Sequence, residues 1–305
     1  MNQVIAITGA SSGFGALTSH ELAKAGHVVY ACLPDIQGIN ASQVRALKKF
    51  AKQQSVDLRP VELNVSSHES AEAVVQRIVS ECGRLDVVIH NAGPVVFGPT
   101  EAFTTEQLAQ LYDTNVLSTQ RVNRAALPVL REQGKGLVIW VAGGEIPGGA
   151  PPYLGPYFAA KAGLDALAVS YAAELARWNI ETAIIIPGLL LSGANDFVSS
   201  ESPSDISRLK QYTSGPTSGL AKQVMKGFEC SVSADAVASQ VARAIVQVID
   251  MPFGTRPFRV HLDPTQNDVE IVNGMADRVR AEILQTMGLA DLLSPSSPPA
   301  IDIYS

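Results

Sequence analysis

Basic charge, paired cysteines and long hydrophobic runs are all scarce in this 305-residue chain. Its 23 lysines and arginines are outnumbered by 29 aspartates and glutamates, which gives a formal net charge of -6. A chain of that charge offers no broad positive field to a phosphate backbone, so nucleic acid is not expected as a partner. The three cysteines, Cys32, Cys82 and Cys230, are odd in number and lack metal-ligand spacing. We therefore expect reduced thiols in a cytoplasmic protein rather than a disulfide framework.

Membrane, secretion and metal signals are also lacking. The apolar run Ala183–Leu191 is interrupted by Pro187-Gly188 and is much shorter than the roughly 20 residues that span a bilayer. The N-terminus has no basic segment and leads directly into an apolar run at Val4, so it does not resemble a secretion signal. No His-x-x-x-His or histidine–carboxylate grouping occurs around the five histidines, which are His20, His27, His68, His90 and His261. The sequence predicts neither a membrane span nor a metal site.

What the chain does contain is a regular alternation of short β-branched runs and longer helical patterns. Strands are expected at Val4–Thr8, His27–Cys32, Leu58–Leu63, Val87–His90, Gly136–Ala142, Thr182–Ile186 and Phe258–Leu262. Helices are expected at Phe14–Ala25, Ser42–Gln53, His68–Cys82, Thr105–Arg131, Tyr157–Trp178, Ala234–Ile249 and Val269–Met287. The strands are nearly all apolar, as strands covered on both faces are. This order predicts a doubly wound parallel sheet of the α/β class.

No repeat or linker divides the chain, so residues 1–290 are expected to form a single domain. Residues 192–218 are rich in Ser, Gly, Pro and Asp, and we predict a loop there. Residues 188–230, which include this loop, are expected to overhang the carboxyl ends of the strands, where ligands bind in such folds. A surface loop without a binding role is the alternative. Residues 291–305 are expected to form a flexible tail.

A glycine-rich turn follows the first expected strand. It reads Thr8-Gly-Ala-Ser-Ser-Gly-Phe-Gly15 and lies directly before the first expected helix. Glycines at 9, 13 and 15 let the backbone approach a pyrophosphate, and the helix N-terminus adds positive potential. The context of strand, turn and helix favours a Rossmann-type dinucleotide site over an ordinary turn.

The turn and four later motifs resemble the short-chain dehydrogenase/reductase family over roughly residues 3–290. The later motifs are Asn91-Ala92-Gly93, Asn115, Tyr157-x-x-x-Lys161 and Pro187-Gly188. The resemblance implies a nicotinamide cofactor, with NADP(H) favoured over NAD(H), and a homodimer or homotetramer paired through Thr105–Arg131 and Tyr157–Trp178. The implied cofactor-binding residues are Gly9, Ser11, Ser12, Gly13, Phe14, Gly15, Leu33, Asn64, Val65, Asn91, Ala92, Gly93, Tyr157, Lys161, Pro187 and Gly188.

Tyr157 and Lys161 are the expected acid/base pair. Four residues apart on a helix that begins near Pro156, they lie on one face. A free phenol has a pKa near 10, and a neighbouring ammonium favours the phenolate and lowers that pKa. The resemblance implies that Tyr157 exchanges the proton, that Lys161 also holds the nicotinamide ribose, and that Asn115 kinks its helix and holds a water linked to Lys161.

The catalytic serine of the family is replaced in this chain. The family places it thirteen residues before the tyrosine, where this sequence has Gly144, and no Ser or Thr occurs from Leu137 to Pro152. Loss of one donor to a developing oxyanion typically lowers a rate by about 10²–10³. A water or a substrate hydroxyl takes its place, or the enzyme is slow, or the reaction is not hydride transfer. Glu145 and Tyr153 are the nearest polar side chains.

Three cofactor positions also depart from the family pattern. Leu33-Pro34-Asp35 stands where relatives place an acidic residue for a ribose hydroxyl or an arginine for a 2′-phosphate. Asn64 replaces an aspartate near the adenine, and its carbonyl still accepts a hydrogen bond. Leu191 replaces the threonine expected beside the nicotinamide carboxamide, with Ser192 as its polar neighbour.

Three functions remain open at this point. The first is an oxidoreductase that transfers a hydride between a nicotinamide and a ketone, aldehyde or secondary alcohol, with a hydrophobic substrate. The second is a lyase, isomerase or cyclase that uses Tyr157 for acid/base chemistry, with the cofactor absent or structural. The third is a nucleotide sensor or scaffold without turnover, which gives no reason for an intact Tyr157 and Lys161. One architecture hosts many reactions, so the fold does not choose among them.

Overall fold

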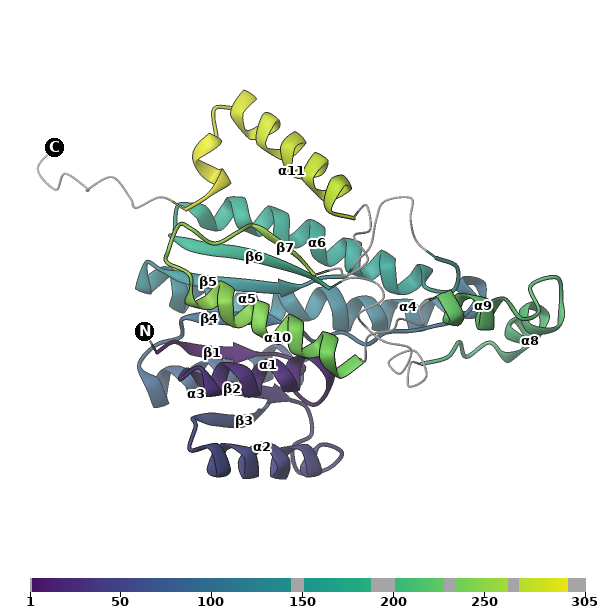
Figure 1. Cartoon of the computed structure of the whole chain (residues 1–305), viewed down its shortest axis with the longest axis horizontal. Coiled ribbons are helices and arrows are strands. Elements are labelled where there is room, and N and C mark those ends of the chain that lie inside the picture. The colour runs from purple at the N-terminus through teal and green to yellow at the C-terminus, as the bar shows by residue number, and fades with distance from the viewer. Residues whose placement is uncertain (1, 144–150, 188–200, 228–233, 263–268, 296–305) are drawn as a thin grey trace, which may run out of the picture.

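A seven-stranded parallel sheet forms the centre of the molecule (Figure 1). The computed structural model describes residues 2–143, 151–187, 201–227, 234–262 and 269–295. The strand order is β3-β2-β1-β4-β5-β6-β7, and every neighbouring pair is parallel. The strands are β1 (Val4–Ile7), β2 (Val28–Leu33), β3 (Leu58–Glu62), β4 (Val87–His90), β5 (Gly136–Val141), β6 (Ile180–Pro187) and β7 (Arg259–Leu262).

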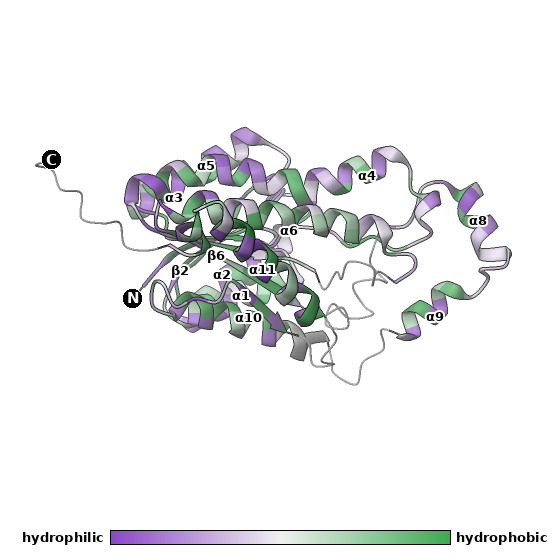
Figure 2. Cartoon of the chain, turned by 90° about the horizontal axis from the view of Figure 1, so that it is seen from above, coloured by the Kyte–Doolittle hydropathy of each residue, from purple (hydrophilic) through white to green (hydrophobic). Residues whose placement is uncertain are grey.

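Helices cover both faces of this sheet (Figure 2). One layer holds α1 (Gly13–Lys24), α2 (Ala41–Gln54) and α10 (Ala234–Asp250), and the other holds α3 (His68–Cys82), α5 (Ser118–Gln133) and α6 (Gly155–Ala176). Successive side chains of β1 point to opposite faces, so Val4 and Ala6 join one core and Ile5 and Ile7 the other. The predicted doubly wound α/β fold is confirmed.

The sheet changes its direction of winding between β1 and β4. The chain passes from β1 outward to β2 and β3, then returns to place β4 on the other side of β1, with Ile7 beside Ile89. Loops that follow adjacent strands at such a switch point diverge and leave a crevice at the carboxyl edge. The glycine turn after β1 and the Asn91 segment after β4 therefore face each other.

The helix predicted at Thr105–Arg131 is not one continuous α-helix. It consists of α4 (Thr105–Tyr112), a π-helical turn (Asp113–Leu117) and α5. Side chains in and beside the turn bond back to the main chain: Asn115 donates to the Leu111 carbonyl at 3.1 Å, and Thr119 to the Val116 carbonyl at 2.7 Å. Such bonds compete with the helix ladder and bend it. The break falls at Asn115, where the resemblance implied a kink.

The loop predicted at residues 192–218 is partly wrong. Residues 206–214 form α8 (Ile206–Ser214), and α9 (Leu220–Gly227) follows it; both extend away from the sheet (Figures 1 and 2). Asp205 caps α8 by accepting the Arg208 N–H at 2.9 Å. Tyr212 ties α8 to Glu101, in the 3-10 turn Thr100–Ala102, through a 2.9 Å hydrogen bond. Residues 192–200 lie outside the described residues.

The described C-terminal part consists of β7, α11 (Val269–Thr286) and a 3-10 turn (Ala290–Leu293). Asp291 in that turn pairs with Arg177 beyond the end of α6 at 2.7 Å. No helix within the described ranges is long and apolar enough to cross a membrane. The same residues contain no group of three or more His, Cys, Asp or Glu side chains arranged to hold a metal ion.

Candidate active site

The glycine turn is packed so tightly against its surroundings that side chains are excluded at two positions. Gly9 has φ +68°, and a Cβ there would lie 2.7 Å from the Ala92 Cα. A Cβ on Gly15 would lie 2.3 Å from the Gly9 carbonyl oxygen. The first turn of α1 is thereby held directly beneath the loop, with its N-terminal N–H groups toward the crevice.

Thr8 and Asn91 fasten this turn to the end of β4. The Thr8 hydroxyl oxygen accepts the backbone N–H groups of Asn91 and Ala92, each at 3.0 Å. The Asn91 amide nitrogen donates to the carbonyls of Thr8 at 3.0 Å and Gly9 at 3.1 Å. Asn91 therefore supports the shape of the loop. Thr8 opens the glycine motif but was not predicted as a site residue.

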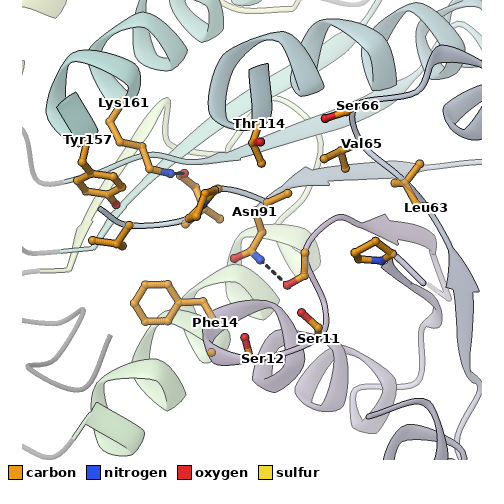
Figure 3. A pocket seen from close by; sticks show the side chains of 18 of the residues that line it. Ser11, Ser12, Phe14, Leu63, Val65, Ser66, Asn91, Thr114, Tyr157 and Lys161 are labelled. Carbon is orange, nitrogen blue, oxygen red and sulfur yellow. Dashed lines mark hydrogen bonds between the residues drawn. The ribbon is translucent and has the colours of Figure 1, made fainter. Parts of the chain in front are cut away.

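A cleft of about 640 Å³ opens over the carboxyl ends of β1, β3, β4 and β5. That volume is in the range of ligand pockets, about 300–1,000 Å³. In Figure 3, Ser11, Ser12 and Phe14 lie on one side of the cleft and Tyr157 and Lys161 on the opposite side. Predicted residues in its lining are Gly9, Ser11, Ser12, Gly13, Phe14, Asn64, Val65, Asn91, Ala92, Gly93, Tyr157 and Lys161.

Tyr157 and Lys161 come together at one end of the cleft. Both project from α6, whose first turn contains Pro156. Lys161 is only 4% exposed, and its ammonium donates to the Val141 carbonyl at the end of β5 at 3.2 Å. The ammonium lies 5.7 Å from the centre of the Tyr157 ring. A buried ammonium beside a phenol favours the phenolate over the neutral form.

Asn115 lies behind this pair and is reached through Gly93. A Cβ on Gly93 would lie 2.2 Å from the Asn115 side-chain oxygen and 3.5 Å from the Lys161 nitrogen. That oxygen is buried and has no hydrogen-bond partner among the described groups. A buried polar atom in that position suits a bridging water. The arrangement places Asn115 within reach of the Lys161 ammonium.

The opposite end of the cleft differs from the prediction at Leu33. Leu33 is fully buried in the core on the α1 side of the sheet, and Pro34 lines the cleft in its place. The Asp35 carboxylate accepts the N–H groups of Gly38 at 3.1 Å and Ile39 at 2.8 Å. Asp35 is therefore committed to its own turn and is not among the residues lining the cleft.

Several predicted residues do not line the cleft. Pro187 is buried as the last residue of β6. Tyr153, one of the two polar neighbours considered for the missing serine, is 8% exposed and packs edge-on against Phe97 at 5.8 Å between ring centres. The remaining positions fall outside the described residues: Gly144, Glu145, Gly188, Leu191 and Ser192.

The structure adds lining residues that the sequence reasoning missed, namely Pro34, Leu63, Ser66, Pro94, Val95, Thr114, Val141, Ala142 and Glu201. Most of them follow directly on strands β2, β3, β4 and β5, so their position at the carboxyl edge of a parallel sheet was an available signal. Thr114 and Glu201 carry no such signal, because only tertiary packing brings them to the cleft.

A buried histidine lies directly below the cleft, at the end of β4. His90 donates to the Asn123 side-chain oxygen at 2.8 Å and packs against Trp140. Burial lowers the pKa of His90 to about 4, whereas an unfolded histidine has a pKa near 6.5. Between about pH 6.5 and pH 4, His90 binds a proton in the unfolded chain but stays neutral in the folded protein. We expect the free energy of unfolding to fall by about 3 kcal/mol as pH drops from about 6.5 to 4.

Urea unfolding of the parent and of His90→Gln at pH 7 and pH 4.5 measures this contribution. The variant is expected to lose about 2–3 kcal/mol less than the parent on acidification. His68→Gln, at a partly exposed histidine on α3, controls for the loss of an imidazole elsewhere in the chain. Equal acid losses in the parent and in His90→Gln would contradict the assignment.

The comparisons with known proteins agree with this geometry. The family model described as short chain dehydrogenase matches residues 3–202. A 3-ketodihydrosphingosine reductase of Bacteroides thetaiotaomicron is 31% identical over 195 residues, which cover 64% of this chain and just under two thirds of that protein, 66%.

Two solved structures show the same fold. A short-chain dehydrogenase from Streptomyces avermitilis is 25% identical, with a TM-score of 0.71, over 95% of this chain and 98% of its own. An alcohol dehydrogenase of the archaeon Thermococcus sibiricus, solved with 5-hydroxy-NADP, is 21% identical, with a TM-score of 0.65, over 86% and 96% of the two chains. Because the family model matches more than half of this chain, the chain belongs to the short-chain dehydrogenase family.

Proposed function

We propose that this protein is an NADP(H)-dependent oxidoreductase that interconverts a ketone or aldehyde and the corresponding alcohol, with Tyr157 as the general acid and base. The observation that carries the proposal is the single cleft with a glycine turn on one side and a buried Lys161 beside Tyr157 on the other. The name of the Bacteroides relative, a reductase, supports the reaction class.

The preference for NADP(H) over NAD(H) rests on the adenosine end of the cleft. The only carboxylate in Leu33-Pro34-Asp35 is turned into its own loop and hydrogen-bonded there. It is therefore not placed to accept a ribose hydroxyl or to repel a 2′-phosphate. The Thermococcus structure, solved with an NADP derivative, supports the same choice.

The residues of the cleft fit a dinucleotide. Gly9 and Gly15 leave no room for side chains beneath the turn, and N–H groups at the start of α1 suit a pyrophosphate. Tyr157 and Lys161 would flank the nicotinamide ribose. When bound, the nicotinamide would supply or accept the hydride at the carbonyl carbon.

The protein's own part in the reaction is movement of one proton and stabilisation of charge. In reduction the Tyr157 hydroxyl donates its proton to the carbonyl oxygen as negative charge develops there. Lys161 stabilises the resulting phenolate through its nearby ammonium, and Asn115 is placed to hold a water through which solvent can return the proton. The apolar lining near the carboxyl ends of β4 and β5, Pro94, Val95, Val141 and Ala142, suits a hydrophobic substrate.

A non-redox reaction, a lyase, isomerase or cyclase step with Tyr157 as acid/base, is the second candidate. The observation that favours it is Gly144, which removes the hydroxyl donor expected beside the substrate oxygen. The two candidates differ in whether the cofactor changes its oxidation state.

Nicotinamide absorbance separates them. The purified protein is mixed with NADPH or NADH and a panel of aliphatic and aromatic ketones and aldehydes, in parent form and as Gly144→Ser. We expect NADPH consumption by the parent and a rise in kcat of about tenfold or more in Gly144→Ser, because a restored donor to an oxyanion is worth up to about 10²–10³.

Gly143→Ser, one residue earlier, is the control and should not raise kcat. Dinucleotide binding without turnover in either form would favour the second candidate. If neither NADPH nor NADH binds, the proposal is overturned.

A further inference from the structure

Polar contacts help to dock the C-terminal helix α11 on the body of the protein. Asn273 bonds to the His261 ring at 3.1 Å, and Asp277 accepts from the buried Arg259 of β7 at 3.1 Å. Arg280 lies over the Phe258 ring, 4.3 Å from its centre. The inner side of α11 therefore carries an amide, a carboxylate and a guanidinium.

The outer side of the same helix is apolar. Ile271 is 70% exposed, Met275 58%, Val279 46%, Ile283 53% and Met287, just beyond the helix end, 64%. With 3.6 residues per turn, this four-residue spacing forms one continuous row that runs obliquely along the helix, with Ile271 and Met275 roughly opposite Asn273 and Asp277. Figure 1 shows α11 at the periphery of the molecule, on the far side of α6 from the sheet centre. An ordinary surface helix keeps such side chains on its inward face, so an exposed apolar row on α11 is unusual.

The exposed apolar area of this row is large enough to indicate an interaction site. Its five side chains expose on the order of 500 Å² of apolar surface, as much as the largest patch of a typical monomer, about 300–600 Å², and such patches mark interaction sites.

The charges on α11 argue against a lipid surface as that partner. The helix carries three acidic residues, Glu270, Asp277 and Glu282, against two basic ones, Arg278 and Arg280, a net charge of -1. Interfacial helices that bind anionic lipid are rich in Lys and Arg on their polar side.

We propose that α11 is a self-association surface, on which a second copy of this chain places its own α11 antiparallel about a two-fold axis near Val279. A row at i, i+4, i+8 packs into the grooves of an identical row at a crossing angle of about -50°. This pairing sets Met275 against the second copy's Ile283 and the two Val279 side chains against each other.

Charge and area fit this pairing. Arg278 of one copy would come within about 3 Å, along the helix axis, of the second copy's Glu282, the same residue types that already pair within α11 at 2.8 Å. The two apolar rows together expose about 1,000 Å², close to the roughly 1,200 Å² at which the range of stable interfaces begins. This surface is separate from the helices at Thr105–Arg131 and Tyr157–Trp178 through which family members are expected to pair.

Sedimentation velocity of the full chain at micromolar concentration tests the proposal. Val279→Glu puts two carboxylates together on the axis and is expected to halve the molecular mass of the main species, with unchanged circular dichroism. Ile39→Glu is the control, because Ile39 is 85% exposed and far from α11 in sequence, and it should leave the mass unchanged. A monomeric parent, or a folded Val279→Glu variant of parental mass, would overturn the proposal.

A cysteine variant gives a positional readout that does not depend on disruption. Val279→Cys is expected to form an intermolecular disulfide under mild oxidation, and Ile39→Cys is not. Co-sedimentation with vesicles of phosphatidylserine and phosphatidylcholine tests whether the row binds a lipid surface instead. Vesicle binding that Val279→Glu abolishes, with no crosslink in the Val279→Cys variant, would show that the row meets lipid and would overturn self-association.

Discussion

Replacing Tyr157 by phenylalanine is expected to lower kcat by about 10²–10⁴-fold, the usual contribution of a positioned general acid. The phenol oxygen is the only atom removed, and the ring stays between the cleft and Phe158, 5.5 Å between ring centres. Dinucleotide affinity should therefore fall by no more than about tenfold, because one neutral hydrogen bond contributes about 0.5–1.5 kcal/mol. Steady-state rates with the best ketone and a fluorescence titration with NADPH measure the two quantities.

Tyr112→Phe is the matched control, because Tyr112 ends α4 and is exposed to solvent. It should retain the parental kcat and affinity. Turnover by Tyr157→Phe at the parental rate would remove Tyr157 from the reaction, whereas a large loss of NADPH binding would show that its hydroxyl holds cofactor rather than moving a proton.

Much of the fold was predictable because strands covered on both faces leave a strong record in the sequence. Val87–His90 was predicted with the bounds that β4 has, and Gly136–Ala142 extends β5 by one residue. The glycine turn, Tyr157 and Lys161 were found for a related reason. Each needs a particular residue type at a fixed spacing, so the requirement is local and can be read without tertiary structure.

Other features were not predictable in the same way, because side-chain bonds to nearby backbone groups or contacts between distant segments override the local pattern. The family resemblance implied a kink at Asn115, but the residue pattern alone predicted one continuous helix, because side-chain bonds to main-chain carbonyls one turn away compete with helix propensity. Capping by Asp205 turns a Ser- and Gly-rich stretch into the start of α8. The orientation of α11 depends on Arg259 of β7, whose guanidinium pairs with Asp277 and so helps to fix which side of the helix faces inward.

Leu33 is an instructive error, because a local rule would have corrected it. Side chains alternate along a strand, so Leu33 shares a face with Val29 and Ala31. All three are fully buried in the core against α1 and α2. The family pattern pointed to the end of β2 in general, and the period of two leaves the next residue, Pro34, to line the cleft.

The glycine turn offers the second large effect, through Gly15→Ala. The added methyl group would lie 2.3 Å from the Gly9 carbonyl oxygen and 2.5 Å from the Asn91 amide nitrogen. The Gly9 carbonyl belongs to the backbone and cannot rotate away as a side chain can. The turn itself must therefore shift, and the 3.1 Å hydrogen bond from Asn91 to the Gly9 carbonyl must lengthen. We expect the variant to lose about 2–3 kcal/mol of stability, as overpacked sites do, and to bind NADPH at least about tenfold more weakly, a loss of about 1.4 kcal/mol.

Gly274→Ala in α11 is the control that isolates the clash from helix propensity. Both glycines are helical, but a Cβ on Gly274 meets nothing within 4 Å. Alanine there should stabilise the protein by up to about 1 kcal/mol and leave the Kd for NADPH unchanged. Gly15→Ala has the same intrinsic gain available and should still be destabilised, because contact with main-chain atoms outweighs it. Parental unfolding and NADPH titration curves for Gly15→Ala would mean that the turn is loose, and a loose turn could not hold a pyrophosphate against α1 in the way the cleft geometry requires.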